Sequence, residues 1–512
     1  MRASKFLIGS LQNWHPFVRS VSQERWRFSP DRGGRLGFLE NPAVWETMTN
    51  ETMDSIKTGA HVPMSWLGHV RATLVLGLPL VGAQLAQMLI NTTDVVMLGW
   101  YGTEELAAGV LATQVFFVIF MFGGGFAHAV VPIASQADGR GDARQVRRSV
   151  RMGLWIVTFY SALVMPLLWT IEPILVLLGQ EPKIARMTGQ YMHITQWGMF
   201  PALWALALRS FFSAVSRTQI ILWATIAGTL SNAFLNYVFI FGNLGASEMG
   251  LEGAAIASLI SSTAIFLVML VSILVRPMFS DYTLFQRFWR PDWPDFFEIV
   301  RLGFPIALTI IAEVGLFVAA SIMMGWIGVV PLAAHGIAMQ IISLSFMIPL
   351  GLSTAVTVRV GQTYARADGE GMRRAAIASL GIAAAIALSA AVLFWTIPET
   401  LVGLFLDRDN PNAKLVLETA VPLLLVGAAF QFFDGMQVTG VGLLRGLKDT
   451  RTPMIMAVVS YWCLGLPTGY LLGIVAGWNG PGVWMGLAIG LAGAAILLNG
   501  RYYVLAKRLA FT

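Results

Sequence analysis

Twelve stretches of mostly apolar residues, each about 20 residues long, follow one another along this chain of 512 residues. A run of this length crosses the hydrocarbon core of a bilayer as an α-helix. Only 12% of the residues are charged and 56% are hydrophobic, whereas a soluble domain carries about 25% charged residues. The sequence therefore predicts an all-α membrane protein whose transmembrane helices cover residues 70–98, 107–133, 153–178, 189–212, 219–242, 251–275, 299–325, 331–357, 375–396, 416–442, 454–475 and 482–505.

The basic residues are divided unequally between the predicted loops. With the N-terminus inside, the cytoplasmic loops contain arginine clusters such as those in segments 140–151 and 366–374. The opposite loops contain only Lys183, Arg186, Arg408 and Lys414. Because short cytoplasmic loops are enriched in Lys and Arg, we expect a multi-pass protein of the cytoplasmic membrane with both termini in the cytoplasm. The net charge of +6 then reflects topology and contact with anionic membrane lipids, and no nucleic-acid partner is expected.

Residues 1–65 do not share this pattern. They mix arginines with tryptophans and lack the apolar segment and cleavage site of a signal peptide. We expect an N-terminal tail that is disordered or lies on the membrane surface. Translation that begins at Met48, Met53 or Met64 is the alternative, and it would remove residues 1–47 from the protein.

An internal repeat relates the two halves of the chain. A shift of 226 positions places residues 77–171 on residues 303–397 without a gap and pairs Pro79 with Pro305. Each half contains six helices, and an even number of crossings returns the chain to the same side of the membrane. Two six-helix lobes related by a pseudo-twofold axis along the membrane normal are therefore expected. The predicted parts are an N-terminal lobe, a cytoplasmic linker and a C-terminal lobe, at 66–275, 276–297 and 298–512.

The repeat continues beyond this segment with a longer offset. Residues 216–218 resemble residues 448–450 after a shift that is six positions longer. Glycines that recur in both halves indicate shared architecture, and the pair Gly99 and Gly325 is expected to end the first and seventh helices.

Three acidic residues, Asp94, Glu313 and Asp434, fall well inside the apolar stretches. An ionised carboxylate inside a bilayer costs several kcal/mol, so it is rarely kept without a function. None of the three recurs in the other half, where the related positions hold one glutamine and two alanines. A residue needed only to build a lobe would recur. This asymmetry favours a functional role over the alternative, a carboxylate neutralised by a partner and kept for packing.

Polar side chains accompany these carboxylates at helical spacing. The accompanying residues are Gln87 and Asn91 before Asp94, Asn232 and Asn236 in the fifth helix, and Gln431 and Gln437 around Asp434. We interpret them as candidate substrate-binding residues, with interhelical hydrogen bonding as the alternative. Glu313 and Asp434 are expected to meet near the membrane midplane and to bind a proton or, as oxygen ligands, a cation such as Na⁺. Exchange of that ion for a cationic substrate is the physical basis of an antiporter.

Other motifs are weak or missing. The sequence contains neither G-x-x-x-x-G-K-[ST] nor H-E-x-x-H, and its one cysteine, Cys463, excludes an internal disulfide. His335 is expected to be a hydrogen-bonded structural histidine, and Gly123–Gly125 a helix-packing or hinge element.

With these residues assembled, the chain resembles the multidrug and toxic compound extrusion (MATE) family, most closely its NorM-like branch. The resemblance covers about residues 70 to 505, and it rests on three motifs together, Asp94–Gly99, Ala312–Val314 and the run from Asp434 to Thr450. It implies a twelve-helix, two-lobed secondary transporter that expels cationic amphipathic compounds in exchange for Na⁺ or H⁺. Some relatives have a tyrosine one turn before the tenth-helix aspartate, where this chain has Phe430. The missing phenolic oxygen favours H⁺.

The resemblance also implies roles for individual residues. Glu313 and Asp434 match the family's cation-coupling carboxylates, and would be the metal ligands only if the ion is Na⁺; Asp94 with Asn232 and Asn236 matches the polar site of the N-terminal lobe. The hypothesis is a multidrug efflux antiporter that works by alternating access, functions as a monomer and needs no cofactor. The alternative is an exporter of a lipid-linked or metabolite cargo on the same superfamily fold. An intramembrane enzyme is not expected, because no nucleophile with a base and no metal-binding set is visible.

Overall fold

The computed structural model describes residues 64–406 and 413–509. The predicted tail therefore lies outside the described residues, apart from its last two positions. In the N-terminal half the helices are α4 (Trp66–Tyr101), α5 (Thr103–Gly139), α6 (Ala143–Trp169), α7 (Ile171–Leu177), α8 (Pro182–Thr195), η2 (Gln196–Gly198), α9 (Met199–Ala214), α10 (Thr218–Phe239), η3 (Asn243–Gly245) and α11 (Gly250–Val275). In the C-terminal half they are η4 (Pro277–Tyr282), α12 (Trp293–Ile327), α13 (Val329–Ala365), α14 (Gly369–Thr396), α15 (Pro398–Gly403), α16 (Ala413–Gly446), α17 (Arg451–Val458), η5 (Val459–Gly465), α18 (Leu466–Tyr470), η6 (Leu471–Val475) and α19 (Asn479–Arg508).

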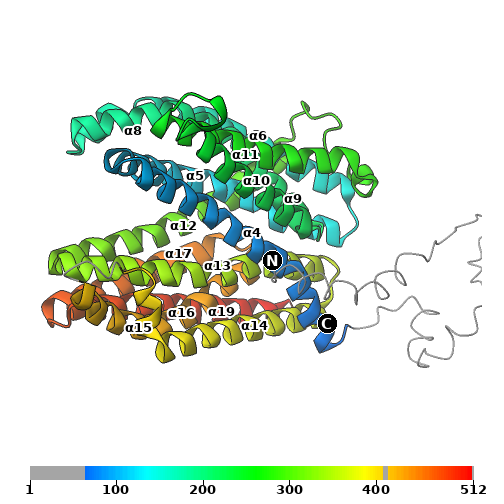
Figure 1. The fold of residues 1–512 in the computed structure, drawn as a ribbon. Coiled ribbons are helices and arrows are strands. Elements are labelled where there is room, and N and C mark those ends of the chain that lie inside the picture. Colours follow the sequence, from blue (N-terminus) through cyan, green and yellow to red (C-terminus); the bar gives the residue numbers. More distant parts are fainter. Residues whose placement is uncertain (1–63, 407–412, 510–512) are drawn as a thin grey trace, which may run out of the picture. The chain divides into compact units, whose positions relative to one another are not determined.

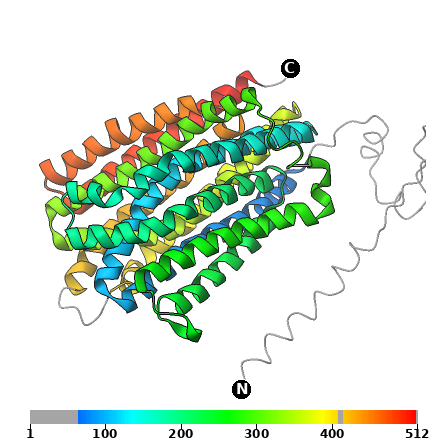
Figure 2. The same ribbon diagram turned by 90° about the horizontal axis from the view of Figure 1, so that it is seen from above.

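These helices confirm the twelve predicted spans. Eleven helices of the described part, with α17 to η6 taken as one, are long and apolar enough to cross a membrane. The twelfth span consists of α8, η2 and α9, which follow one another without a break. The protein is thus an all-α, multi-pass membrane protein. Figure 1 shows its helices side by side, and Figure 2 shows the same bundle from above.

The predicted ends of the first and seventh helices are wrong. Helix α4 continues past Gly99 to Tyr101, and α12 continues past Gly325 to Ile327. The next residues, Gly102 and Gly328, are themselves a repeat pair and leave the helical conformation. The continuation is reasonable because a glycine inside a long helix costs only about 1 kcal/mol.

Several helices also extend beyond the predicted apolar stretches at one end of the bundle. We call this end the basic end and define it by the loops at 140–142, 366–368 and 447–450. Helix α5 continues to Gly139 and α13 to Ala365, several residues past their predicted ends. Hydropathy predicts that a membrane helix ends where polar residues begin. In these two helices the polar residues are hydrogen-bonded within the protein, so the helices continue.

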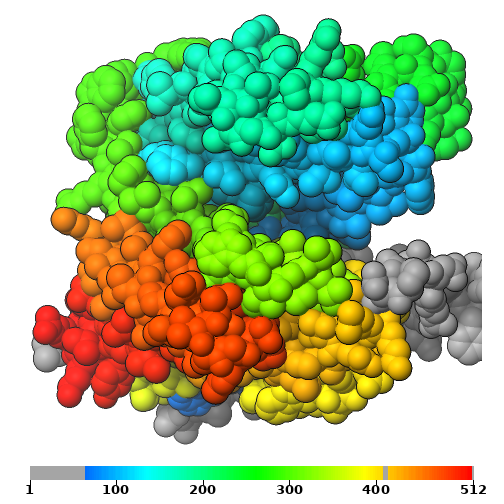
Figure 3. Space-filling view, turned by 90° about the vertical axis from the view of Figure 1, so that its left-hand side faces the viewer, coloured from blue at the N-terminus to red at the C-terminus, as the bar shows by residue number. Residues whose placement is uncertain are grey.

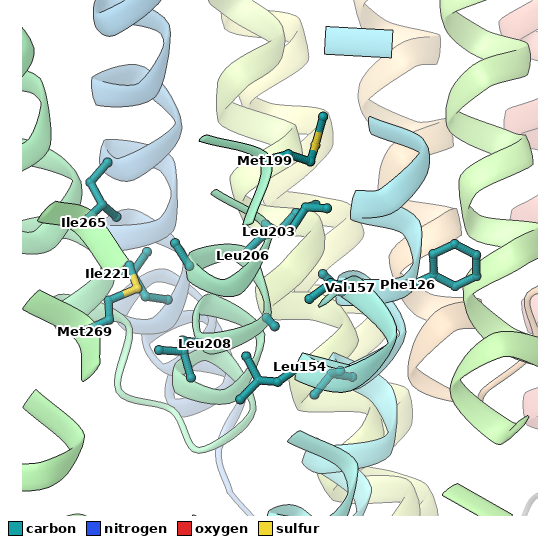
Figure 4. Close-up of a cluster of buried hydrophobic side chains, with 14 of the residues drawn as sticks. Phe126, Leu154, Val157, Met199, Leu203, Leu206, Leu208, Ile221, Ile265 and Met269 are labelled. Carbon is teal, nitrogen blue, oxygen red and sulfur yellow. The ribbon is translucent and has the colours of Figure 1, made fainter. Parts of the chain in front are cut away.

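Two buried hydrophobic clusters divide the bundle into the two lobes. The first is built almost entirely from α4 to α11, and the second from α12 to α19. In Figure 1 the first group forms the upper, blue-to-green layer and the second the lower, green-to-red layer. Figure 4 shows part of the first cluster, where Leu203 and Leu206 of α9 lie beside Val157 of α6. The exact division of the chain into lobes and linker remains a prediction.

The first helix of each half begins on the other lobe. The early residues of α12, Ile299, Leu302 and Ile306, belong to the first hydrophobic cluster, whereas Leu316 belongs to the second. Helix α4 in turn packs on α13 and α14. At the basic end, the start of α4 therefore packs on the C-terminal lobe and the start of α12 packs on the N-terminal lobe. Helix α12 thus contributes to both hydrophobic clusters.

Close helix contacts join the lobes near the middle of the bundle, slightly toward the basic end, and they follow the repeat. A Cβ at Gly125 of α5 would lie 2.6 Å from the backbone nitrogen of Ala307 in α12. A Cβ at Gly351 of α13 would lie 2.7 Å from Cα of Val81 in α4. Gly351 is the repeat partner of Gly125, and Ala307 is that of Val81. The two contacts are thus related by the predicted pseudo-twofold axis, and both need glycine for close approach.

A pair of glutamines forms a second symmetric connection. Gln136 Nε2 donates to the carbonyl oxygen of Gly446 at 2.9 Å, and its repeat partner Gln362 donates to the carbonyl oxygen of Ala214 at 3.1 Å. The same longer offset that aligned residues 216–218 with 448–450 relates the two acceptors. The repeat therefore describes contacts between the lobes as well as their internal architecture.

A glycine ladder joins the last two spans of the C-terminal lobe. Gly469 of α18 and Gly473 of η6 lie against Gly486 and Gly482 of α19. A Cβ at Gly486 would lie 2.2 Å from Cα of Gly469. Small residues at four-residue spacing let two membrane helices approach closely, and van der Waals packing then holds them together.

Gly486→Leu is therefore expected to prevent folding of the C-terminal lobe, because overpacking against a neighbouring backbone cannot be relieved by a side-chain rotation. Gly500→Leu in the same helix is the matched control, since a Cβ at Gly500 has no neighbour within 4 Å. The measurement is the yield of monodisperse protein in size-exclusion chromatography. Equal yields for the two variants would contradict the packing role.

Candidate functional site

Two carboxylates, Glu313 of α12 and Asp434 of α16, lie close enough in the C-terminal lobe to interact electrostatically. Asp434 is 2% exposed, and Glu313 is partly exposed. Neither makes an ion pair with any cation in the described part of the chain. The predicted pair is thus present as neighbouring acids without a bound basic side chain.

Several buried polar atoms around Asp434 have no hydrogen-bond partner within the described protein. They are Asp434 Oδ1, both amide atoms of Gln431, and Gln437 Oε1. Gln431 is fully buried, so its amide gains nothing from solvent. A buried polar atom without a partner is costly. This concentration of free oxygen atoms is suited to a proton or to a cation that takes oxygen ligands.

Tyr461 joins this group, and sequence reasoning missed it. Its hydroxyl accepts a 2.7 Å hydrogen bond from Gln437 Nε2, and the ring is fully buried. The phenol also interacts electrostatically with Glu313 and Asp434. It lies in η5, a π-helical segment, and such segments are frequent at functional sites. The only signal in the sequence was a tyrosine inside an apolar stretch.

The phenol of Tyr461 weakens the argument that was based on Phe430. Phe430 is fully buried and packs against Phe317 and Trp484 rather than facing a polar group. A phenolic oxygen is nevertheless present beside the carboxylates, and it comes from a different helix. The missing tyrosine in α16 therefore gives no preference between H⁺ and Na⁺.

Asp94 occupies a separate site in the N-terminal lobe. Asn236 Nδ2 donates to Asp94 Oδ1 at 2.5 Å, and Ser258 Oγ donates to Asp94 Oδ2 at 3.0 Å. Asn236 also donates to Asn232 Oδ1 at 3.3 Å, and both asparagines are fully buried. The structure thus brings Asp94, Asn232 and Asn236 together, as their spacing predicted, and it adds Ser258 from α11.

The remaining predicted residues of α4 lie differently. Gln87 is half-buried and Asn91 is exposed. Neither lies in the hydrogen-bonded group around Asp94. The predicted stripe of Gln87, Asn91 and Asp94 therefore lies only partly in the Asp94 site, and its other residues face a more open surface.

Basic side chains lie closer to the site than the sequence suggested. The predicted tenth span ended at residue 442 and left Arg445 in the following loop, but α16 continues to Gly446, and Arg445 interacts electrostatically with Glu313. His128 of α5 interacts with both Arg445 and Arg209. Arg209 donates to Gln84 Oε1 at 3.0 Å. Arg445 of the C-terminal lobe thus lies near Glu313, and His128 lies near both Arg445 and Arg209 of the N-terminal lobe.

Two weaker predictions are confirmed. His335 is 2% exposed and lies between Trp484 Nε1, which donates to its Nδ1 at 3.1 Å, and the Ser321 hydroxyl. Gly125 provides close packing between α5 and α12, as described above. Both residues therefore serve architecture.

The lobes are separated at the end opposite the basic end. Figure 3 looks onto that end, and the surface is hollowed between the blue-to-cyan part of the N-terminal lobe and the green and orange parts of the C-terminal lobe below it. The interlobe hydrogen bonds of Gln136 and Gln362 lie at the far side, near the basic end. The described conformation is thus closed at the basic end.

Comparison with known proteins identifies the family. A family model described as MatE matches residues 79–238 and 305–471, which together make up more than half of the chain. The chain belongs to the MatE family. The two matched segments begin at Pro79 and Pro305, a pair of the internal repeat, so the MatE model recognises each half separately.

Several known proteins are similar to this chain over nearly their whole length. A probable multidrug resistance protein NorM from Rhizobium meliloti is 50% identical over 87% of this chain and 96% of the relative. The protein of the same name from Agrobacterium fabrum is 49% identical over 87% and 96%. Among solved structures, a MATE protein in complex with MaL6 gives a TM-score of 0.80 at 20% identity, covering 87% of this chain and 98% of that one. The eukaryotic MATE transporter AtDTX14 gives 0.77 at 19% identity, covering 87% and 99%. At these identities the likeness to the solved structures is one of fold, and it agrees with the two-lobed MatE architecture.

Asn236→Ala is expected to destabilise the protein by about 1–3 kcal/mol, because a hydrogen-bond donor to the partly buried Asp94 carboxyl is lost. Asn243→Ala in the η3 turn is the control, since that side chain donates only to a nearby backbone oxygen, of Tyr237. Thermal unfolding of the purified proteins provides the measurement. The same midpoint for Asn236→Ala and the unchanged protein would show that the Asp94 site is not held together as described.

Proposed function

We propose that this protein is a secondary active multidrug efflux antiporter of the cytoplasmic membrane. It expels small cationic, lipophilic compounds in exchange for H⁺ or Na⁺. Glu313 and Asp434 carry the coupling ion, and Asp94 binds a cation in the N-terminal lobe. Both termini lie in the cytoplasm, so the basic end is the cytoplasmic end, and one chain is the functional unit.

One observation carries this proposal: two neighbouring acids, surrounded by unpartnered oxygen atoms, stand in the interior of a membrane protein. The free atoms are concentrated around Asp434, and Glu313 adds a second carboxyl from another helix. Negative charge in a low-dielectric interior strongly favours a bound cation. A small cation and a larger organic cation therefore compete for this site, and the competition couples their opposite movements.

The contacts between the lobes suggest how the site changes sides. The seam between the lobes is made of paired glycine contacts near the middle of the bundle and two glutamine hydrogen bonds nearer the basic end. Such contacts break and re-form at small cost when one lobe rocks against the other, as in transporters with a site between two repeats. The described state then represents the outward-open form.

Efflux of a fluorescent lipophilic cation from vesicles tests the proposal. Purified protein in liposomes is exposed separately to an imposed H⁺ gradient and an imposed Na⁺ gradient. The acidic pair has oxygen ligands for either H⁺ or Na⁺. Efflux that follows only one of the two gradients therefore identifies the coupling ion. Efflux that follows neither gradient would refute ion-coupled antiport.

The second candidate is an exporter of a lipid-linked or metabolite cargo with an anionic head group. The observation in its favour is Arg445, which interacts electrostatically with Glu313, together with a second membrane-embedded arginine, Arg209, in the other lobe. A carrier of phosphate head groups needs such positive charge. Competition by an anionic, but not a cationic, compound in the vesicle assay would favour this candidate over multidrug efflux.

A further inference from the structure

An arginine-lined pocket lies at the basic end, outside the site described above. It has a volume of about 330 Å³ and lies between the start of α6 and the segment that connects α11 to α12. The arginines that line it are Arg144, Arg147, Arg148, Arg151, Arg287 and Arg290. The last two belong to the connecting segment, so both parts of the chain contribute positive charge.

The charge of this pocket is only partly neutralised. Arg148 pairs with Asp292 and lies 3.6 Å from Asp295, and Arg151 lies 3.9 Å from Asp292. These two carboxylates are the only acidic partners of the six arginines in the described part of the chain. Arg148 also holds the pKa of Asp292 below its ordinary value, so Asp292 stays ionised near neutral pH. Six guanidinium groups against two carboxylates leave a strong positive excess.

The individual arginines are arranged for a ligand rather than for each other. Arg151 is 5% exposed, and its Nε has no hydrogen-bond partner within the described protein. Arg147 is held by two neutral groups, the Thr283 hydroxyl at 2.5 Å and Gln286 Oε1 at 2.9 Å, which position the guanidinium without neutralising it. Arginine in such fixed positions binds phosphate groups through paired hydrogen bonds.

Exposed aromatic side chains lie in the segment that forms one wall of the pocket and in the start of α12. Trp289 is 82% exposed, Trp293 is 54% exposed and Phe297 is 63% exposed. Trp293 is itself part of the pocket wall. Exposed tryptophans in a multi-pass protein concentrate at the level of the lipid head groups. The pocket is therefore open at the depth where anionic head groups lie, and basic pockets beside transmembrane helices bind such groups.

We propose that this pocket binds a ligand that carries two phosphate groups, held between α6 and the connecting segment. The charge excess requires more than one negative charge, and the volume is at the lower end of the range for ligand pockets, about 300 Å³. The same chemistry is present in a membrane lipid with a bisphosphate head group and in soluble pyrophosphate. The aromatic surroundings favour the lipid. This site is independent of the proposed transport function.

Native mass spectrometry of the purified full chain tests this assignment. The probes are diphosphatidylglycerol, added to detergent-solubilised protein, and phosphatidylethanolamine as a zwitterionic comparison. The test variant is Arg144→Gln/Arg290→Gln, because neither arginine makes an ion pair in the described structure. The control is Lys507→Gln/Arg508→Gln, which removes the same charge from exposed positions near the C-terminus.

Diphosphatidylglycerol is expected to bind the unchanged protein and the control equally. The test variant is expected to bind about tenfold or more weakly, because each basic residue at an anionic surface contributes several-fold to affinity. Arg144→Lys/Arg290→Lys is expected to restore much of the binding, which separates loss of charge from a folding defect.

Pyrophosphate, added in competition, distinguishes the two sources. If pyrophosphate fails to displace the lipid, the lipid head group is the natural ligand. If pyrophosphate displaces the lipid and also binds by itself, the natural ligand is a soluble bisphosphate. Both results support the bisphosphate site. Binding that is equal in the unchanged protein and the Gln variant, or equal for both lipids, would overturn it.

Discussion

Asp434→Asn and Glu313→Gln, made separately, are expected to reduce extrusion of a lipophilic cation to the level of cells that lack the protein. Each change keeps the shape of the side chain but removes one of the two neighbouring acids. The remaining acid loses the charge that makes the pair selective for cations, so neither the coupling ion nor the substrate is held strongly. Fluorescent-cation accumulation in cells, with protein level measured in the same cells, provides the test.

Glu418→Gln is the matched control, because Glu418 lies on the same helix as Asp434 but is exposed near Lys414. Its removal is expected to leave efflux unchanged, since exposed ion pairs contribute little. Efflux that survives in both the Asp434 and the Glu313 variant, at normal protein level, would refute the coupling assignment. Loss of efflux in Glu418→Gln would show that α16 is sensitive to any change of charge.

Gly351→Val is expected to stop transport by preventing closure of the seam between the lobes. A Cβ at this position would lie 2.7 Å from the backbone of Val81, so the two helices must separate. Each lobe keeps its own hydrophobic cluster, and the protein is therefore expected to fold. The overpacking costs about 1–3 kcal/mol, enough to move the balance between the closed and open forms of this seam.

Spin labels at Arg144 and Arg451, introduced as cysteines in a Cys463→Ser protein, measure this separation. Both positions are exposed and belong to different lobes at the basic end. Gly351→Val is expected to shift the distance between the labels to longer values and to reduce efflux. Gly336→Val on the same helix is the control, because a Cβ at Gly336 has no neighbour within 4 Å. An unchanged distance in Gly351→Val would contradict the role of this contact.

Much of the fold followed from the sequence because a bilayer allows few solutions. Apolar runs of fixed length predict spans, and the 226-residue repeat predicts two similar lobes. Periodicity placed Asn232 and Asn236 on one face of their helix, since residues four apart share a face, and the family resemblance paired that face with Asp94 of another helix. The ends of α4 and α12 were missed because glycine is only a weak signal for where a membrane helix stops.

The composition of the candidate site was only partly predictable. Tyr461 and Ser258 were missed because each lies on a different helix from the acid it approaches. Arg445 was misplaced because the sequence pattern ended the helix too early. The pocket at the start of α6 gave no signal beyond a basic loop, since its shape depends on where the connecting segment folds back.

The sequence alone determined the membrane class, the twelve spans, the twofold repeat and the three acids that break it. These properties depend on the cost of placing polar groups in lipid, which is local and can be read residue by residue. The tertiary structure decided that α4 and α12 cross to the opposite lobe, that glycine pairs connect the lobes near the middle of the bundle, and that Tyr461 stands beside Glu313 and Asp434. These features depend on the distances between helices, and such distances are set by side-chain packing across the whole bundle.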